Sequence, residues 1–164
     1  MPAAPRPVNT GIARLAPSAI RRIGSLAAAT PGCISLALGE PEFDTPDPVR
    51  AEAKAALDRG ETHYAPNAGT PGLRRAISAY MADRGLAYAP DEVLVTLGAT
   101  EAISSSLLAL LNPGDEIIIP APAFVSYESV TRMNHAVPVR LDTAPCGFQI
   151  DEEALRALVT DATK

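Results

Sequence analysis

Lysine is almost missing from this chain of 164 residues: twelve of its fourteen basic side chains are arginine, and Lys54 and Lys164 are the only lysines. Tryptophan is absent, and cysteine and histidine occur twice each. Cys33 and Cys146 lie far apart and form no CxxC motif, so neither a disulfide framework nor a zinc site is indicated. Any chemistry that needs a lysine nucleophile must therefore use one of the two lysines or lie outside this chain.

Charge and hydropathy exclude several classes of protein. Fourteen basic against nineteen acidic residues give a net charge of −5. The chain thus lacks the excess of positive charge that is typical of proteins that bind nucleic acid or an anionic membrane. No apolar run approaches the ~20 residues that a membrane-spanning helix needs. The length allows one domain or part of a larger one. We expect a cytoplasmic protein that binds neither nucleic acid nor membrane.

The order of helix caps and short apolar runs along the chain predicts an α/β fold. Three helices are expected to start at caps, at Asp47–Pro48, Thr70–Pro71 and Asp151. The first 39 residues contain no acid, and we expect an N-terminal arm with a short helix there rather than a cleaved signal. Short apolar runs that alternate with helical segments predict three strands, at 93–97, 117–119 and 137–141. This alternation is typical of a mainly parallel sheet with helices on both faces.

Ligand chemistry is expected beyond the carboxyl ends of these strands. Gly98, Ala99 and Thr100 follow the first strand at the entry to a helix, where backbone N–H groups, the helix dipole and a hydroxyl favour a phosphate. A tight turn with threonine as a cap is the alternative. Phe124 follows the second strand and can either cover a flat ring or pack in the core.

Two further candidates lie in loops before these strands. Tyr64, in a loop with several turn-forming residues, can give a hydroxyl to an anion. Gly39 either lets a ligand approach the backbone closely or is a turn glycine.

Five blocks stand out in chain order: Leu36–Pro46; Tyr64–Gly69 with Leu73–Arg74 and Ala76–Ile77; Thr96–Ile103; Leu111–Glu116; and Pro122–Tyr127. Together they resemble one family, the class I/II aminotransferases of the aspartate aminotransferase superfamily, which are pyridoxal-phosphate enzymes of fold type I. The resemblance covers nearly the whole chain from about residue 10.

The resemblance implies a role for each candidate in holding pyridoxal 5'-phosphate. Gly98, Ala99 and Thr100 would hold the phosphate, with the Thr100 hydroxyl as a donor. Phe124 would stack on the pyridine ring, and Tyr64 would reach the phosphate of the partner's cofactor across a homodimer interface. The implied activity, within amino acid metabolism, is transfer of an amino group between an amino acid and a 2-oxo acid.

The same resemblance implies a substrate contact and a domain division. Gly39 would bound the substrate carboxylate through its backbone. Residues 1–45 would form the N-terminal arm and the start of the small domain, and residues 46–164 the N-terminal portion of the large, cofactor-binding α/β domain.

The lysines depart from the family pattern. Neither Lys54, on an expected helix, nor Lys164 matches the Schiff-base lysine, so no catalytic residue is assigned and an N-terminal fragment without activity of its own is expected. The alternatives are a complete small α/β module that binds a phosphorylated ligand, a non-catalytic interaction protein and, within the family, a C–S lyase. If the chain is a fragment, its apolar strands would have unpaired edges, so we expect poor solubility or oligomers.

Overall fold

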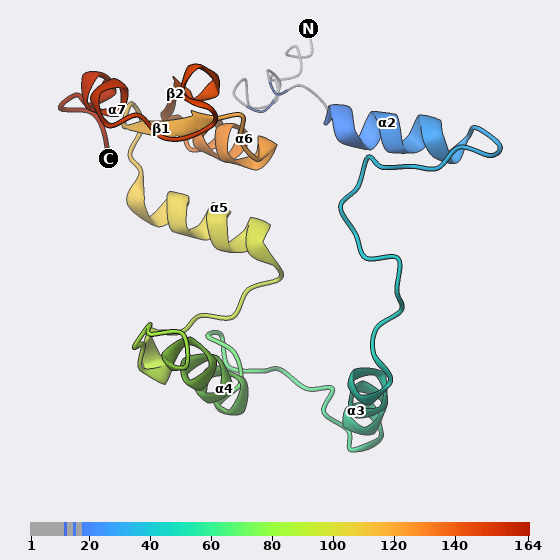
Figure 1. Cartoon of the computed structure of the whole chain (residues 1–164). Coiled ribbons are helices and arrows are strands. Elements are labelled where there is room, and N and C mark those ends of the chain that lie inside the picture. The colour runs from blue at the N-terminus through green and yellow to red at the C-terminus, as the bar shows by residue number, and fades with distance from the viewer. Residues whose placement is uncertain (1–11, 13–14, 16–17) are drawn as a thin grey trace, which may run out of the picture. The chain divides into compact units, whose positions relative to one another are not determined.

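A computed structural model describes residues 12, 15 and 18–164 (Figure 1). It divides into two compact units, which are described separately: residues 20–96, and residues 97–164 with the described residues up to Ala19. Residues 1–11, 13, 14, 16 and 17 of the expected N-terminal arm lie outside the described residues, and the described part contains a short helix at Ala19–Ala28, as predicted. The expected domain boundary after residue 45 stays a prediction.

The first unit is helical. It contains α2 (Ala19–Ala28, whose first residue belongs to the other unit), α3 (Asp47–Asp58), α4 (Pro71–Ala82) and the 3₁₀ turn η1 (Pro90–Glu92). Thr70 caps α4 as predicted, because its hydroxyl accepts the N–H of Leu73 at 3.4 Å. Asp47 was expected to cap α3, but Pro46 occupies that position and Asp47 is already helical. The Asp47 carboxylate still favours the helix from within its first turn, through the dipole.

Residues 93–97 do not form the expected strand. The backbone there bonds to other partners: the N–H of Val95 donates to the carbonyl of Ala68 at 3.1 Å, and Nε of Arg74 donates to the carbonyl of Val93 at 2.9 Å. A β-branched run becomes a strand only beside another strand that completes its ladder. In the part of the chain that the structure describes, this segment has a loop and an arginine beside it instead.

The second unit carries a parallel sheet of two described strands, β1 (Glu116–Ala121) and β2 (Val137–Asp142) (Figure 1). The α/β class and the parallel pairing are confirmed, and both strands are somewhat longer than predicted. The helices of this unit are α5 (Ala99–Leu110), α6 (Val125–Met133), which connects the two strands, and α7 (Glu152–Leu158), with the 3₁₀ turn η2 (Ala144–Cys146) after β2. Asp151 caps α7 as predicted, with the N–H of Ala154 donating to its carboxylate at 2.7 Å.

A small core forms where α6 packs on the sheet. Its buried apolar side chains are those of Ile119, Val130, Ala136 and Leu141. On α5, Ile103 and Leu107 are half-buried, but Leu110 is 58% exposed. Among the described residues, therefore, part of the apolar surface of this helix is open to solvent.

β1 is the inner strand of this arrangement. Its first residue, Glu116, is paired with Val137 on one side and forms a parallel bridge with Thr163 on the other. The N–H of Glu116 donates to the carbonyl of Ala162 at 2.7 Å, and its carbonyl accepts the N–H of Lys164 at 2.9 Å. After β1 the chain forms β2 on one side of β1, and the residues around Thr163 then pair with the other side of β1. No helix among the described residues has the length and apolar character to span a membrane.

Candidate functional site

α5 begins with a glycine cap. Gly98 has a φ of +85°, a conformation that side chains rarely adopt, and it provides no side-chain cap. The carboxylate of Glu101 reaches back to accept the N–H of Leu97, which fixes the approach of the chain to the helix. Ala99 and Thr100 are therefore the first two helical residues, and both are exposed.

The geometry of an α-helix leaves its first N–H groups without intrahelical acceptors and places partial positive charge at that end. At α5 the first of these groups belong to the small residues Gly98, Ala99 and Thr100, with Glu101 next, and Thr100 adds a hydroxyl. The expected position of Gly98, Ala99 and Thr100 at a helix entry is confirmed, whereas their contact with a phosphate remains a prediction.

The carboxyl end of β1 is the second part of the candidate site. Because the connections from β1 lead to one side of the strand and later return to the other, a crevice is expected beyond this end. Phe124 lies there as the N-cap residue of α6 and is 51% exposed. Its ring meets that of Tyr127 edge-on, with 5.9 Å between centroids. Phe124 therefore has one supported edge and an accessible surface.

Phe124 lines an open groove of about 580 Å³, named here the Phe124 groove. Ile119 and Ala121 of β1 form an apolar part of its wall. Charged residues of α6 and β2 line another part: Glu128, Arg132 and Arg140.

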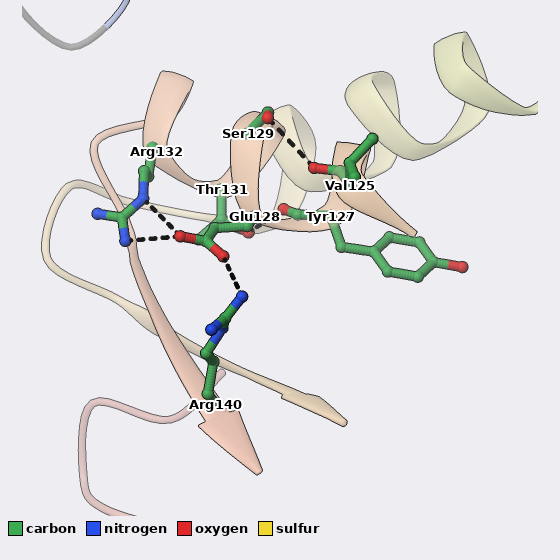
Figure 2. Close-up of polar contacts among 7 residues, drawn as sticks. All are labelled: Val125, Tyr127, Glu128, Ser129, Thr131, Arg132 and Arg140. Carbon is green, nitrogen blue, oxygen red and sulfur yellow. Dashed lines mark hydrogen bonds and ion pairs between the residues drawn. The ribbon is translucent and has the colours of Figure 1, made fainter. Parts of the chain in front are cut away.

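Those charged residues form one network (Figure 2). Arg132 donates from Nε and Nη2 to one carboxylate oxygen of Glu128, at 3.2 and 2.8 Å. Nη2 of Arg140 lies 3.6 Å from the other oxygen. The Glu128 carboxylate thus joins α6, the helix that Phe124 caps, to β2.

A second groove, of about 460 Å³, lies between α5, α6 and β1. Ala102 and Ile103 of α5 line it with Tyr127 and the buried Thr131 of α6. Tyr127 therefore contacts the Phe124 ring and also lines a groove shared with the first turns of α5. The two helices that follow Gly98 and Phe124 are therefore neighbours within this unit.

Gly39 and Tyr64 belong to the other unit. Gly39 lies in an irregular segment, and a Cβ at this position would meet nothing within 4 Å. Tyr64 is fully exposed in the loop before α4. Their expected contacts with substrate and cofactor stay predictions.

Of the two lysines, only Lys164 belongs to the unit that carries the sheet, and it lies away from the Phe124 end of β1. Lys164 is bonded through its backbone to Glu116, at the amino end of β1, whereas Phe124 follows the carboxyl end. A strand of this length separates the two ends by about 16 Å. Lys54 lies on α3, in the other unit.

Two features of the site were missed by the sequence analysis. Glu128 and Arg132 are spaced i, i+4 on one helix face, a readable signal for an ion pair. Thr143 is buried directly after β2, and the sequence analysis expected ligand chemistry beyond the carboxyl ends of strands without considering this residue. The contact of Arg140 with Glu128 depends on the packing of α6 on β2 and has no such signal.

Comparisons with known proteins agree with this geometry. Residues 31–164 match the family described as aminotransferase class I and II. The chain is 42% identical over 158 residues to a probable aspartate aminotransferase of Methanocaldococcus jannaschii, covering 96% of this chain and 41% of that protein. It is 39% identical over 149 residues to a probable N-acetyl-LL-diaminopimelate aminotransferase of Bacillus subtilis, covering 90% of this chain and 38% of that protein.

Solved structures give the same result. The aspartate aminotransferase of Thermus thermophilus with maleate superposes with a TM-score of 0.91 at 36% identity, covering 97% of this chain and 43% of that one. The chain thus spans about two fifths of the length of the relatives it matches. The matched residues include both helix starts and the whole sheet, and the chain belongs to the class I and II aminotransferases.

Proposed function

We propose that the longer protein represented by this chain is a pyridoxal-phosphate-dependent aminotransferase, which transfers an amino group between an amino acid and a 2-oxo acid. The observation that carries the proposal is the presence of two helix starts in one unit. One, at Gly98–Thr100, has a glycine turn and a helix dipole that favour an anion, and the other, at Phe124, has an accessible aromatic ring. Family membership supports the same chemistry.

The residues of the described chain fit this cofactor. The Gly98 turn and the first N–H groups of α5 match the chemistry of a phosphate, and the Thr100 hydroxyl adds a donor. Phe124 is suited to lie over a planar ring, since its edge contact with Tyr127 supports it from one side. When bound, pyridoxal phosphate supplies the electron sink for loss of the proton at the substrate α-carbon.

This chain's part in the reaction is binding and orientation. Gly98, Ala99 and Thr100 would hold the phosphate, and Phe124 would fix the plane of the ring. The lysine that normally moves the proton would come from the remainder of the protein, because Lys164 is bonded at the far end of β1.

The finer expectations are part of the same proposal. Gly39 would bound the substrate carboxylate, and Tyr64 would reach the partner's cofactor in a homodimer. The exposure of Tyr64 is what such a contact requires. A cytoplasmic location is favoured by the exposed, free thiols of Cys33 and Cys146. A role in amino acid metabolism is supported by membership of the family.

The test uses the longer protein, obtained by extending the chain with its downstream coding sequence. Amino transfer from a panel of amino acids to 2-oxoglutarate is measured for the wild type, for Thr100→Ala and for Ser105→Ala, which removes an exposed hydroxyl from the same helix. We expect transfer by the wild type and Ser105→Ala, with a clear loss in Thr100→Ala. Release of the substrate side chain without amino transfer would overturn the proposal.

A further inference from the structure

The carbonyl of Ala121, at the carboxyl end of β1, accepts two hydrogen bonds from one residue. The N–H of Thr143 donates to it at 3.1 Å and the Thr143 hydroxyl donates at 2.8 Å. Thr143 is only 5% exposed, and it is one of two buried polar residues among those described. The last residue of β1 is thus held by a buried donor pair from beyond the end of β2.

Thr143 is itself fixed by the loop that follows. Its carbonyl accepts the N–H of Cys146 at 3.1 Å and the N–H of Phe148 at 2.9 Å. Its N–H, hydroxyl and carbonyl are therefore all engaged in a fixed frame. Phe124 lies three residues after Ala121, so the hydrogen bonds of Thr143 fix the residue from which the turn to the aromatic ring begins.

The sheet alone does not require the hydroxyl. The backbone N–H of Thr143 already continues the parallel ladder, in which Ala121 is opposite Asp142. Valine has nearly the shape of threonine and would fill the same buried site without a polar group that must be satisfied. What the hydroxyl adds is a second, differently directed bond on the Ala121 carbonyl, and hence a restricted orientation of the peptide that leads to Phe124.

We propose that Thr143 is a positioning residue, whose buried hydroxyl orients the turn at Ala121 and thereby the ring of Phe124 over the cofactor. The inference rests on the proposed function, because it requires Phe124 to stack on the pyridine ring. Thr143 lines neither groove and would touch neither cofactor nor substrate, so it would act only through Ala121 and the turn.

The experiment is a double-mutant cycle in the longer protein. Pyridoxal 5'-phosphate is titrated into Thr143→Val, Thr143→Ser, Phe124→Ala and the combination of Thr143→Val with Phe124→Ala. Affinity and the visible circular dichroism of the bound cofactor are recorded, together with the melting temperature of each cofactor-free protein. Thr143→Ser keeps the hydroxyl and loses only a methyl group, so it is the matched control.

We expect Thr143→Val to bind about fivefold more weakly, as loss of one buried hydrogen bond implies, and to change the dichroism of the bound cofactor. Thr143→Ser should stay within about twofold of the wild type. In the Phe124→Ala background, Thr143→Val should weaken binding no further, because the ring through which it acts is gone.

Each failure has its own signature. If Phe124→Ala binds as tightly as the wild type, the stacking role in the proposed function is wrong. If Phe124→Ala weakens binding but Thr143→Val does not, or weakens it equally in both backgrounds, the positioning role is overturned while the proposed function stands. A Thr143→Val protein that melts early is judged by Thr143→Ser. Normal affinity and dichroism in Thr143→Ser support the role of the hydroxyl, and an equal loss of affinity in the two variants contradicts it.

Discussion

Gly69 and Val95 approach so closely that no side chain fits between them. A Cβ on Gly69 would lie 2.5 Å from Cγ2 of Val95, and Gly69 has a φ of +97°. The neighbouring residue, Ala68, accepts the N–H of Val95 at 3.1 Å. This contact ties the loop that carries Tyr64 to the segment that leads into Gly98.

Gly69→Ala should therefore destabilise the longer protein by on the order of 2 kcal/mol, through overpacking and a strained backbone. Thermal unfolding measures the effect. Gly72→Ala is the control, because Gly72 lies in α4 with nothing within 4 Å of a Cβ and should be neutral or stabilising by up to about 1 kcal/mol. Equal melting temperatures for the two variants would show that Gly69 and Val95 are not packed as described.

Phe124→Ala should release pyridoxal phosphate from the longer protein more readily while the fold is kept. The aromatic contact contributes on the order of 1 kcal/mol beyond buried area. Cofactor retained after dialysis is compared with that of Phe148→Ala, which removes a similarly exposed ring from outside both grooves. A Phe124→Ala protein that retains cofactor but melts earlier would make Phe124 a packing residue.

The 164-residue chain alone should not catalyse amino transfer. The physical reason is the position of Lys164, whose backbone is bonded to Glu116 at the opposite end of β1 from Phe124. Turnover of amino acid and 2-oxo acid pairs is assayed with added cofactor. Activity that Thr100→Ala abolishes would contradict this expectation.

Glu128→Gln should cost about 0.5–1 kcal/mol of stability in the longer protein, because the carboxylate and its two arginines are partly exposed to solvent. The loss should shrink as salt is added. Glu152→Gln, which breaks the more exposed pair with Arg156 within one helix, should cost less. A salt-independent loss from Glu128→Gln would show that the carboxylate acts through packing rather than charge.

The isolated chain should form oligomers or precipitate. Apolar residues such as Leu36, Leu94 and Leu97 are 92%, 61% and 93% exposed, and an open sheet edge is a template for association. Hydrodynamic size and a thermal melt decide the matter. A monomer with a sharp cooperative transition would favour a self-contained domain.

Local signals in the sequence predicted local structure well. Thr70 and Asp151 cap their helices as expected, because a cap depends on residues within one turn. The strand expected at 93–97 is missing, because a strand depends on a partner that local pattern does not provide. The loop residues Gly39 and Tyr64 were candidates from residue type and loop context, and only the resemblance gave them specific roles. Thr143 was missed because its role arises only when the ends of β1 and β2 meet.

The most direct test of the account is whether the Gly98–Thr100 turn holds a phosphate. In the longer protein, affinities for pyridoxal 5'-phosphate and for pyridoxal, which lacks the phosphate, are measured for the wild type, Thr100→Ala and Ser105→Ala. The account predicts that Thr100→Ala lowers affinity for the phosphorylated form by about tenfold, as loss of a hydrogen bond to a charged group implies. Affinity for pyridoxal should be unchanged, and Ser105→Ala should match the wild type for both. Equal affinity of wild type and Thr100→Ala for pyridoxal 5'-phosphate would contradict the account.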